Sequence, residues 1–230
     1  MMPGDVVTGR VLLMRHPETV ANTEHFFSGR TDVALSPAGL AQRERGVEAL
    51  VAFAPERIYC SPLSRAREMA QMAAGRLGVP CESWDELLEV DFGPLECLPS
   101  GAVRDRGIDF PWPLGPDGTS MTPEGAESLE HLRARARAAY ERLVPLAGKT
   151  ACVTHGGFLR MFQAVAYDVP LTRFWDVHIL NAASLFYTSD GHDLALGGFN
   201  LSPEEVIELS TTPSAYDTRD VWGTGRRELA

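Results

Sequence analysis

Two arginines and two histidines stand just after short apolar segments of the sequence, and their side chains can do chemistry on anions. The four residues are Arg15, His16, Arg65 and His155. Guanidinium groups bind phosphate oxygens in a two-pronged manner, and a neutral imidazole can act as a nucleophile. One such residue alone is more often structural than functional. Four of them near three strand ends instead favour a binding site for a dianion such as phosphate.

The segments that must position these side chains are the apolar runs 11–14, 58–60 and 150–153. Each is short and continuous, which is typical of a strand buried on both faces. The carboxyl ends of parallel strands meet at one edge of a sheet, so we expect the four side chains to lie together there. Helices are expected to begin at the same edge, after Ser61-Pro62 and near Gly156-Gly157, and their free N–H groups would attract an anion.

Strand-like and helix-like segments alternate along most of the chain. Helices are predicted over 37–52, 62–77, 129–143 and 158–167, strands over 81–84, 184–188 and 193–199, and a last helical stretch over 203–209. This order predicts an α/β fold, a three-layer α/β/α sandwich with a mostly parallel central sheet. We interpret residues 1–230 as a single domain, with a core of about residues 10–200 and a C-terminal tail over 201–230.

Three segments depart from this alternation or face solvent. Residues 17–35 are predicted to form a loop. Residues 91–125 hold six prolines and show no period. Because long loops inside a compact domain are usually functional, we interpret them as an irregular insertion over the active site. The polar face of the helix predicted over 129–143 is expected to be solvated, and it carries Arg133, Arg135, Arg137 and Arg142.

The chain has 31 acidic and 21 basic side chains among 230 residues, and its formal net charge is −10. Nucleic acid and anionic membranes are therefore disfavoured as partners, because both attract a positive surface. No apolar run approaches the ~20 residues of a membrane span, and the start, 1–5, lacks the basic and apolar regions of a signal peptide. The four cysteines show no paired spacing and are interpreted as reduced thiols, which predicts a cytoplasmic protein.

Four ordered segments resemble the motifs of the histidine phosphatase (phosphoglycerate mutase-like) superfamily. They are Leu13–Thr19 followed by Asn22 and Ser28-Gly29, then Ser61–Ala66, Leu87–Gly93 and Val153–Gly157. The resemblance covers about residues 11–160, with the order and relative spacing of the motifs preserved. It implies the phosphoglycerate mutase-like fold and a reaction through a phosphohistidine.

The resemblance also implies a role for each motif residue. His16 would be the nucleophile, and Glu89 would protonate the leaving oxygen and then deprotonate the attacking water. Arg15, Arg65 and His155 would stabilise the transferred phosphoryl group. The implied phosphate-binding set is Arg15, Asn22, Ser28, Gly29, Arg65, His155 and Gly156. No metal ion and no cofactor are implied.

Two positions depart from the family pattern, and one acid competes with Glu89. Pro17 stands where a glycine usually follows the nucleophile, which removes an N–H but keeps a carbonyl that can accept from the imidazole. Leu95-Glu96-Cys97 replaces the usual tryptophan-glutamate-glycine, so the expected substrate contacts are altered there. Asp91 is a rival proton donor, because alternation along a strand would place it on the same side as Glu89.

We expect metal-independent hydrolysis of a small-molecule phosphate monoester, with inorganic phosphate as a product. The mutase branch has a longer insertion with an arginine pair, whereas here Glu89 and His155 are 66 residues apart and the insertion holds only Arg104 and Arg106. Mutase-type phosphoryl transfer is therefore the first alternative, and a non-catalytic phosphate-binding module is the second. The sequence leaves open the substrate, among sugar phosphates, nucleotide-related monoesters and phosphoglycerate derivatives. It also leaves open the oligomeric state, a homodimer included.

Overall fold

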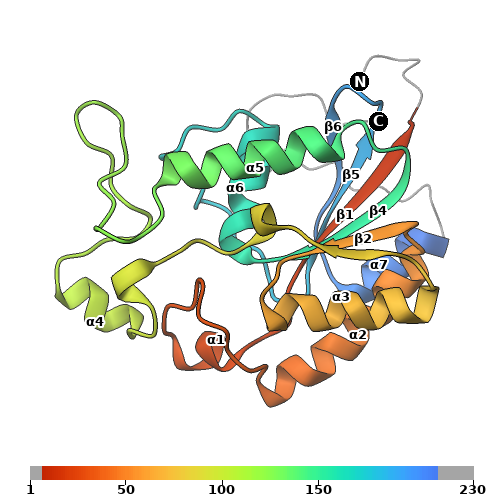
Figure 1. The fold of residues 1–230 in the computed structure, drawn as a ribbon, viewed down its shortest axis with the longest axis horizontal. Coiled ribbons are helices and arrows are strands. Elements are labelled where there is room, and N and C mark those ends of the chain that lie inside the picture. The colour runs from red at the N-terminus through yellow and green to blue at the C-terminus, as the bar shows by residue number, and fades with distance from the viewer. Residues whose placement is uncertain (1–6, 212–230) are drawn as a thin grey trace.

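The computed structural model describes residues 7–211, and within them one mixed six-stranded sheet forms the centre of the molecule (Figure 1). The start of the chain and the tail beyond 211, both discussed above, lie outside this range. The strands are β1 (Gly9–Arg15), β2 (Arg57–Cys60), β3 (Cys81–Ser83), β4 (Gly148–Thr154), β5 (Ser184–Ser189) and β6 (Leu194–Leu201). Their order is β3-β2-β4-β1-β5-β6. The first four run parallel, and β5 is antiparallel to β1 and β6, which confirms the mostly parallel sheet.

Helices cover both faces of this sheet, as the alternating pattern predicts. They are α1 (Val20–Glu24), α2 (Pro37–Phe53), α3 (Ser64–Leu77), α4 (Ser100–Asp105), α5 (Leu129–Leu143), α6 (Gly156–Ala166) and α7 (Pro203–Thr211). In Figure 1, α5 and α6 lie on one side of the sheet, and α2, α3 and α7 lie on the other. The three-layer α/β/α sandwich is therefore confirmed.

Strand β1 is apolar without interruption over residues 11–14, and it is covered on both faces of the sheet. Val11 and Leu13 pack into the hydrophobic cluster under α5 and α6, whereas Leu12 and Met14 pack into the cluster under α2 and α3. All four side chains are fully buried. Because successive side chains of a strand point to opposite faces, a strand covered on both sides needs apolar residues at every position.

Helix ends follow the expected signals with small shifts. Ser36 caps α2 by accepting a hydrogen bond from Gly39 N at 2.9 Å, and Pro37 occupies the first helical position. Helix α3 begins at Ser64, two residues later than the predicted start at Pro62, and Leu63 is its N-cap residue. The predicted loop 17–35 contains the short helix α1.

The insertion is less irregular than predicted. It contains a 3₁₀ turn, η2 (Gly93–Leu95), and the short helix α4. It also joins the segment that follows α1, since Phe27 N donates to Leu98 O at 3.0 Å and Cys97 N donates to Phe27 O at 2.8 Å. An aromatic cluster lies between the two segments and consists of Phe27, Phe92, Phe110 and Trp112. The insertion is thus anchored beside the loop that carries Ser28 and Gly29.

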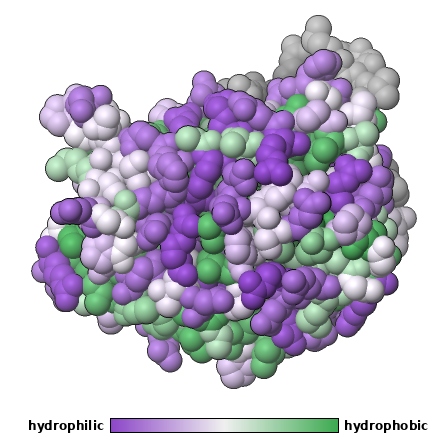
Figure 2. Space-filling view, viewed as in Figure 1, coloured by the Kyte–Doolittle hydropathy of each residue, from purple (hydrophilic) through white to green (hydrophobic). Residues whose placement is uncertain are grey.

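The face of the molecule that Figure 2 presents is mainly polar. Figure 2 shows hydrophilic residues over most of the face that it presents, with apolar patches between them. Over residues 7–211, no helix is long and apolar enough to cross a membrane.

Candidate active site

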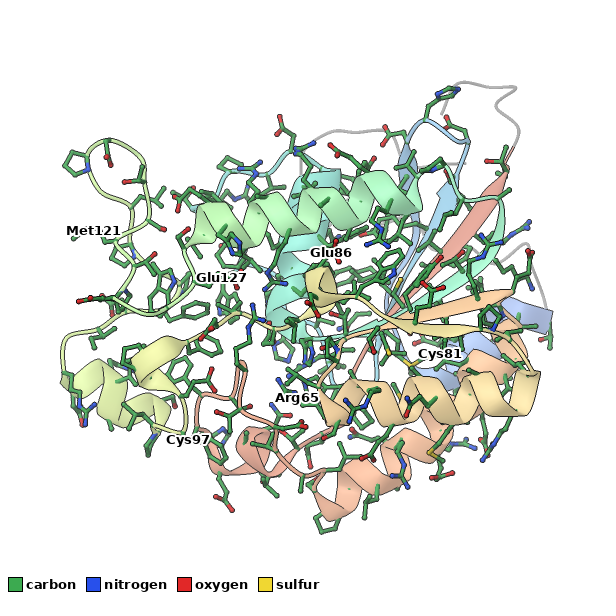
Figure 3. The ribbon with its side chains drawn as sticks, in the orientation of Figure 1. Arg65, Cys81, Glu86, Cys97, Met121 and Glu127 are labelled. Carbon is green, nitrogen blue, oxygen red and sulfur yellow. The ribbon has the colours of Figure 1, made fainter. Side chains whose placement is uncertain are left out.

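Three parallel strands bring the predicted side chains to one edge of the sheet. Arg15 is paired with Thr154 in the register of β1 and β4, and His16 N donates to Thr154 O at 2.8 Å. His16 and His155 consequently lie side by side, with ring centroids 5.1 Å apart. Arg65 arrives from the start of α3, just beyond the end of β2 (Figure 3). The structure therefore brings together the four residues with which the sequence argument began.

The imidazole of His16 is held in one tautomer. Its Nδ1 donates to the carbonyl oxygen of Pro17 at 2.6 Å, which leaves a lone pair on Nε2. This bond confirms that the carbonyl partner survives the replacement of glycine by proline. Burial, followed by the charges of Arg65 and Arg15, lowers the pKa of His16 well below 6.5. His16 is thus a neutral imidazole with a free nucleophilic nitrogen.

Arg15 and Arg160 form a pair of guanidinium groups above the start of α6. Arg15 donates from Nη1 to Ile179 O at 2.6 Å, and its Nε is buried without a partner among the described residues. Arg160 donates from Nε to Val177 O at 2.7 Å. A Cβ at Gly156 would lie 3.1 Å from Arg15 Nε and 3.1 Å from an Nη of Arg160, so the glycine leaves room for both. Burial, Arg160 and Arg65 lower the pKa of Arg15 to about 10.

Arg65 is the most extensively bonded cation of the site. Its guanidinium donates to the carbonyl oxygens of Ser28, Gly29 and Thr31 at 3.1, 2.7 and 2.9 Å. Its Nε also donates to His155 Nδ1 at 3.3 Å. Arg65 therefore ties the loop 28–31 to the second histidine, and one N–H on Nη1 remains for an anion.

His155 is fully buried, and both of its ring nitrogens contact protein. Nδ1 accepts from Arg65, so Nε2 carries the proton and donates to Ser61 Oγ at 2.7 Å. Burial and the charge of Arg65 lower its pKa well below 6.5. In this arrangement His155 holds the side chains of Arg65 and Ser61 through hydrogen bonds. Its predicted contact with a phosphoryl oxygen stays a prediction.

The predicted neutral contacts lie in α1 and in the loop that follows it. Asn22 Oδ1 accepts from Thr19 N at 3.0 Å and from Asn181 Nδ2 at 3.1 Å, which leaves the Asn22 amide nitrogen as the donor. Ser28 and Gly29 contribute their carbonyl oxygens to Arg65, whereas Gly29 N is bound by a carboxylate. These residues shape the pocket through their backbone as well as their side chains.

That carboxylate belongs to Glu96, which the sequence analysis mentioned only as part of a departure from the family pattern. It accepts from the backbone N–H groups of Gly29, Arg30, Thr31 and Phe92 at 2.9 to 3.2 Å. The same loop supplies the three carbonyl oxygens that hold Arg65. Glu96 therefore fixes the loop, and the loop fixes the guanidinium. The position of Glu96 seven residues after Glu89 carried no local signal for this role.

Glu89 lies at the N-terminus of α6, where backbone N–H groups hold its carboxyl group. Oε2 accepts from Gly157 N at 3.0 Å, and Oε1 accepts from Phe158 N at 3.1 Å and from Val90 N at 2.9 Å. A Cβ at Gly157 would overlap this carboxyl group, so Gly157 is needed for the close approach. Glu89 thus shares the first turn of α6 with the phosphate-binding residues.

Asp91 makes contacts different from those of Glu89. The segment between them is not a strand, so the alternation assumed in the sequence analysis does not apply. Asp91 Oδ1 accepts from Gly93 N at 2.8 Å, and its other oxygen lies 3.9 Å from Arg30 Nε. The rival acid is therefore engaged in the insertion.

The expectation of a fully solvated arginine face on α5 is wrong for Arg135. It is buried and forms a two-pronged ion pair with Glu127, at 2.7 and 2.9 Å. Burial alone would raise the pKa of Glu127. The pKa is lowered instead, because Arg135 donates hydrogen bonds to the carboxylate and places a positive charge beside it. Arg135 also donates to the carbonyl oxygens of Leu88 and Glu89. It therefore holds the backbone on both sides of the Leu88–Glu89 peptide, and Figure 3 shows Glu127 beside α5.

Comparison with known proteins agrees with this site. A family model described as histidine phosphatase superfamily (branch 1) matches residues 11–201. Bifunctional protein Rv2228c of Mycobacterium tuberculosis is 32% identical over 189 residues, which make up 76% of this chain and 49% of that protein. The chain therefore spans about half the length of the first curated relatives that it matches.

Relatives of similar length to this chain include phosphatases and phosphoglycerate mutases by name. Adenosylcobalamin/alpha-ribazole phosphatase of Salmonella typhimurium is 26% identical over 173 residues, covering 74% of this chain and 85% of that protein. The structure of mycobacterial glucosyl-3-phosphoglycerate phosphatase Rv2419c with VO3 has a TM-score of 0.72, 24% identity, and coverage of 84% of this chain and 99% of that one. This structural likeness shows the shared fold. On the family match and the preserved strand-end motifs, the chain belongs to the histidine phosphatase superfamily, branch 1.

Proposed function

We propose that this protein hydrolyses a small-molecule phosphate monoester through a phosphohistidine on His16. The observation that carries the proposal is the state of the His16 imidazole. Its Nδ1 proton is committed to Pro17 O, which leaves a lone pair on Nε2, and its burial and two guanidinium neighbours keep it neutral. Within residues 7–211, the buried Nε of the neighbouring Arg15 has no hydrogen-bond partner. A buried neutral imidazole next to uncompensated positive charge is suited to attack on an anionic phosphorus centre.

The chemistry follows from the positions of the two acid–base groups. His16 Nε2 forms a bond to phosphorus as the bond to the leaving oxygen breaks, and Glu89 gives its proton to that oxygen. A water molecule then attacks the phosphohistidine while the Glu89 carboxylate takes a proton from the water, so inorganic phosphate leaves and the starting state returns. Arg15 and Arg65 supply positive charge throughout. Gly157 N and Phe158 N keep the Glu89 carboxyl group in place between the two steps.

Hydrolysis is favoured over mutase-type transfer by the placement of the insertion. Its two basic residues, Arg104 and Arg106, are exposed on and just after α4. They are thus not drawn into the buried pocket, where a clamp for a returning phosphoglycerate would be needed. The names of the relatives do not separate the two reactions, since a phosphatase and a phosphoglycerate mutase both occur among them.

The test is release of inorganic phosphate from 4-nitrophenyl phosphate in the presence of a chelator. We expect turnover by the native protein, none by His16→Ala, and a ~10²–10⁴-fold lower kcat for Glu89→Gln, the usual contribution of a general acid. Rapid quenching should trap an acid-labile, base-stable phosphoprotein. Glu124→Gln, a change of an exposed carboxylate in the insertion, is the matched control and should behave as the native protein.

Two outcomes would contradict the proposal. Phosphate release by His16→Ala at the native rate would remove the nucleophile from the reaction. Binding of phosphate or vanadate without any turnover would instead favour the non-catalytic phosphate-binding module.

A further inference from the structure

The peptide group that follows the proposed nucleophile has no N–H. Its nitrogen belongs to Pro17, and a proline nitrogen carries no proton. The carbonyl oxygen of His16 is therefore the only polar atom through which hydrogen bonds can hold this peptide group. Two donors reach that oxygen, Ala182 N at 3.2 Å and Asn181 Nδ2 at 3.3 Å. The turn before β5 thus holds the peptide group from the side of its carbonyl.

The position of this peptide group affects the tautomer of His16. The next carbonyl along the chain, Pro17 O, accepts the Nδ1 proton of His16 at 2.6 Å. The proline ring fixes φ at about −65°, so only ψ of Pro17 remains free between the two peptide groups. A fixed His16 carbonyl therefore restricts the position of Pro17 O, and Pro17 O decides which imidazole nitrogen keeps its lone pair.

The same amide nitrogen of Asn181 also donates to Asn22 Oδ1, at 3.1 Å. Because Nδ2 carries two N–H groups, one can bond His16 O and the other can bond Asn22. Thr19 donates to the same Oδ1 from its backbone N–H and from its hydroxyl group, both at 3.0 Å. A flipped Asn22 amide would set its own N–H groups against these donors, so the orientation of the amide is fixed.

This orientation decides what Asn22 can offer to an anion. The family motifs imply that Asn22 belongs to the phosphate-binding set. Only the NH₂ end of an amide can donate to a phosphate oxygen, since the other end is an acceptor. Within residues 7–211, Asn22 Nδ2 donates to no protein group. The bond from Asn181 therefore helps to keep a free donor on Asn22.

The turn that carries Asn181 is held by bonds that do not involve its side chain. Ala183 N donates to Leu180 O at 3.2 Å, and Ala183 O accepts from Arg15 N at 2.9 Å. Leu180 N donates to Asn200 Oδ1 at 2.8 Å. The turn is thus bonded to the end of β1 and to β6 independently of the Asn181 amide. The amide itself bonds only the two site residues, His16 and Asn22.

We propose that Asn181 is a positioning residue, whose side-chain amide holds the His16–Pro17 peptide group and turns the N–H groups of Asn22 toward the bound phosphoryl group. The inference rests on the proposed hydrolysis and gives Asn181 no contact with the substrate. It acts through His16, by supporting the tautomer that leaves Nε2 free, and through Asn22, by orienting a donor.

The first experiment measures kcat/KM with 4-nitrophenyl phosphate. We expect Asn181→Ala to lower it about 10–100-fold, the scale of a misplaced catalytic group. Asn181→Asp keeps the shape of the side chain but replaces its N–H groups by an acceptor, so it should lower kcat/KM at least as far. Asn200→Gly is the matched control. It removes the bond to Leu180 N from the same turn, glycine accepts the φ of 56° found there, and kcat/KM should stay native.

Two measurements need no turnover and therefore separate this inference from the proposed hydrolysis. Nitrogen-15 NMR reports which imidazole nitrogen of His16 carries the proton, and His16→Asn identifies the signals by their loss. The native protein should show a protonated Nδ1 alone, whereas Asn181→Ala should show averaged shifts. Calorimetry should show inorganic phosphate binding about tenfold more weakly to Asn181→Ala. The double variant Asn22→Ala/Asn181→Ala should bind phosphate as weakly as Asn22→Ala alone, because the two residues act as one unit.

Native imidazole shifts in Asn181→Ala would overturn the role toward His16, and additive losses in the double variant would overturn the role toward Asn22. An equal loss of kcat/KM in Asn200→Gly would overturn both, because any loosening of the turn would then suffice. If the shifts and phosphate binding are as expected but the native protein does not turn over 4-nitrophenyl phosphate, the result counts against the hydrolysis alone. Melting temperatures show whether each variant folds, and Asn181→Asp carries the NMR and calorimetric tests if Asn181→Ala unfolds.

Discussion

His16 and His155 are two imidazoles whose properties come from their immediate neighbours. The carbonyl of Pro17 sets the tautomer of His16, while Arg65 and Ser61 set that of His155. Burial is the largest cause of the lowered pKa of each, and nearby arginines are the second. At this scale a single carbonyl oxygen decides which nitrogen of His16 keeps its lone pair, and so which nitrogen would attack phosphorus in the proposed reaction.

The two lowered pKa values predict how stability depends on pH. An imidazole in the unfolded chain has a pKa of about 6.5, so below that pH the unfolded state takes up protons that the folded state does not. The free energy of unfolding should therefore have its full value above about pH 6.5 and decrease as the pH falls below it. Denaturant unfolding at pH 7.5, 6.5 and 5.5 measures this.

The double variant His16→Asn/His155→Gln is the control for that measurement. Its free energy of unfolding should fall less than that of the native protein over the same interval. Native stability that increases between pH 7.5 and pH 5.5 would be incompatible with two buried neutral imidazoles.

At the scale of elements, two carboxylates outside the predicted catalytic set hold the segments that carry the candidate site. Glu96 fixes the loop 28–31, and Glu127 pairs with Arg135 behind the segment that carries Glu89. Both carboxylates lie near the ends of the insertion or just beyond it. The insertion thus positions site residues through its own polar side chains, besides forming an aromatic rim.

Glu96→Ala should loosen the loop that holds Arg65. Hydrogen bonds to a charged group contribute about 1.5–3 kcal/mol, so we expect an unfolding free energy lower by about 2 kcal/mol. We also expect vanadate to inhibit the variant at least about tenfold less well, because Arg65 is no longer fixed. Glu96→Gln, which keeps two acceptor positions at most, should fall between the two proteins.

Vanadate inhibition separates positioning from bulk stability. Glu124→Gln should leave both the stability and the inhibition unchanged. If Glu96→Ala loses stability but binds vanadate as tightly as the native protein, the loop is structural and does not position Arg65.

At the scale of the whole molecule, a chain with a net charge of −10 concentrates buried positive charge at one edge of its sheet. The cost of burying these guanidinium groups is offset in part by their hydrogen bonds to carbonyl oxygens and by the charge of Glu89, and a bound anion would offset more of it. The packing of helices on both faces, with every residue of β1 from 11 to 14 buried, supports that edge. The fold and its ligand should therefore be strongly linked.

Inorganic phosphate should raise the free energy of unfolding through this linkage. At a concentration 100 times its Kd, binding to the folded state alone contributes about 2.7 kcal/mol. Thermal unfolding in phosphate, compared with chloride at equal ionic strength, measures the effect, and Arg15→Gln should reduce it. An identical melting temperature in phosphate and chloride would show that the edge does not bind the dianion.

The order of layers and the residues that meet at the strand ends were predictable because their signals are local. An apolar run indicates a buried strand, a Ser-Pro pair indicates a helix start, and parallel strands must place Arg15, His16 and His155 at one edge. The expected roles of these residues came from the family motifs. Their proximity, however, follows from sheet geometry and is what the structure shows.

Other features depended on contacts between segments that are remote in sequence. Arg160 is buried because the segment with Trp175 and Val177 folds back against α6 and contacts its guanidinium. Arg135 is buried because Glu127, just before α5, forms an ion pair with it. No periodic pattern in the sequence indicates the ion pair of Glu127 with Arg135, the hydrogen bonds of Glu96 or those of Asp91. Sequence pattern determines which segments are buried, because burial of apolar surface is a property of each segment. Which polar groups face one another inside is decided by the tertiary structure, because hydrogen bonds and charges depend on distance in space.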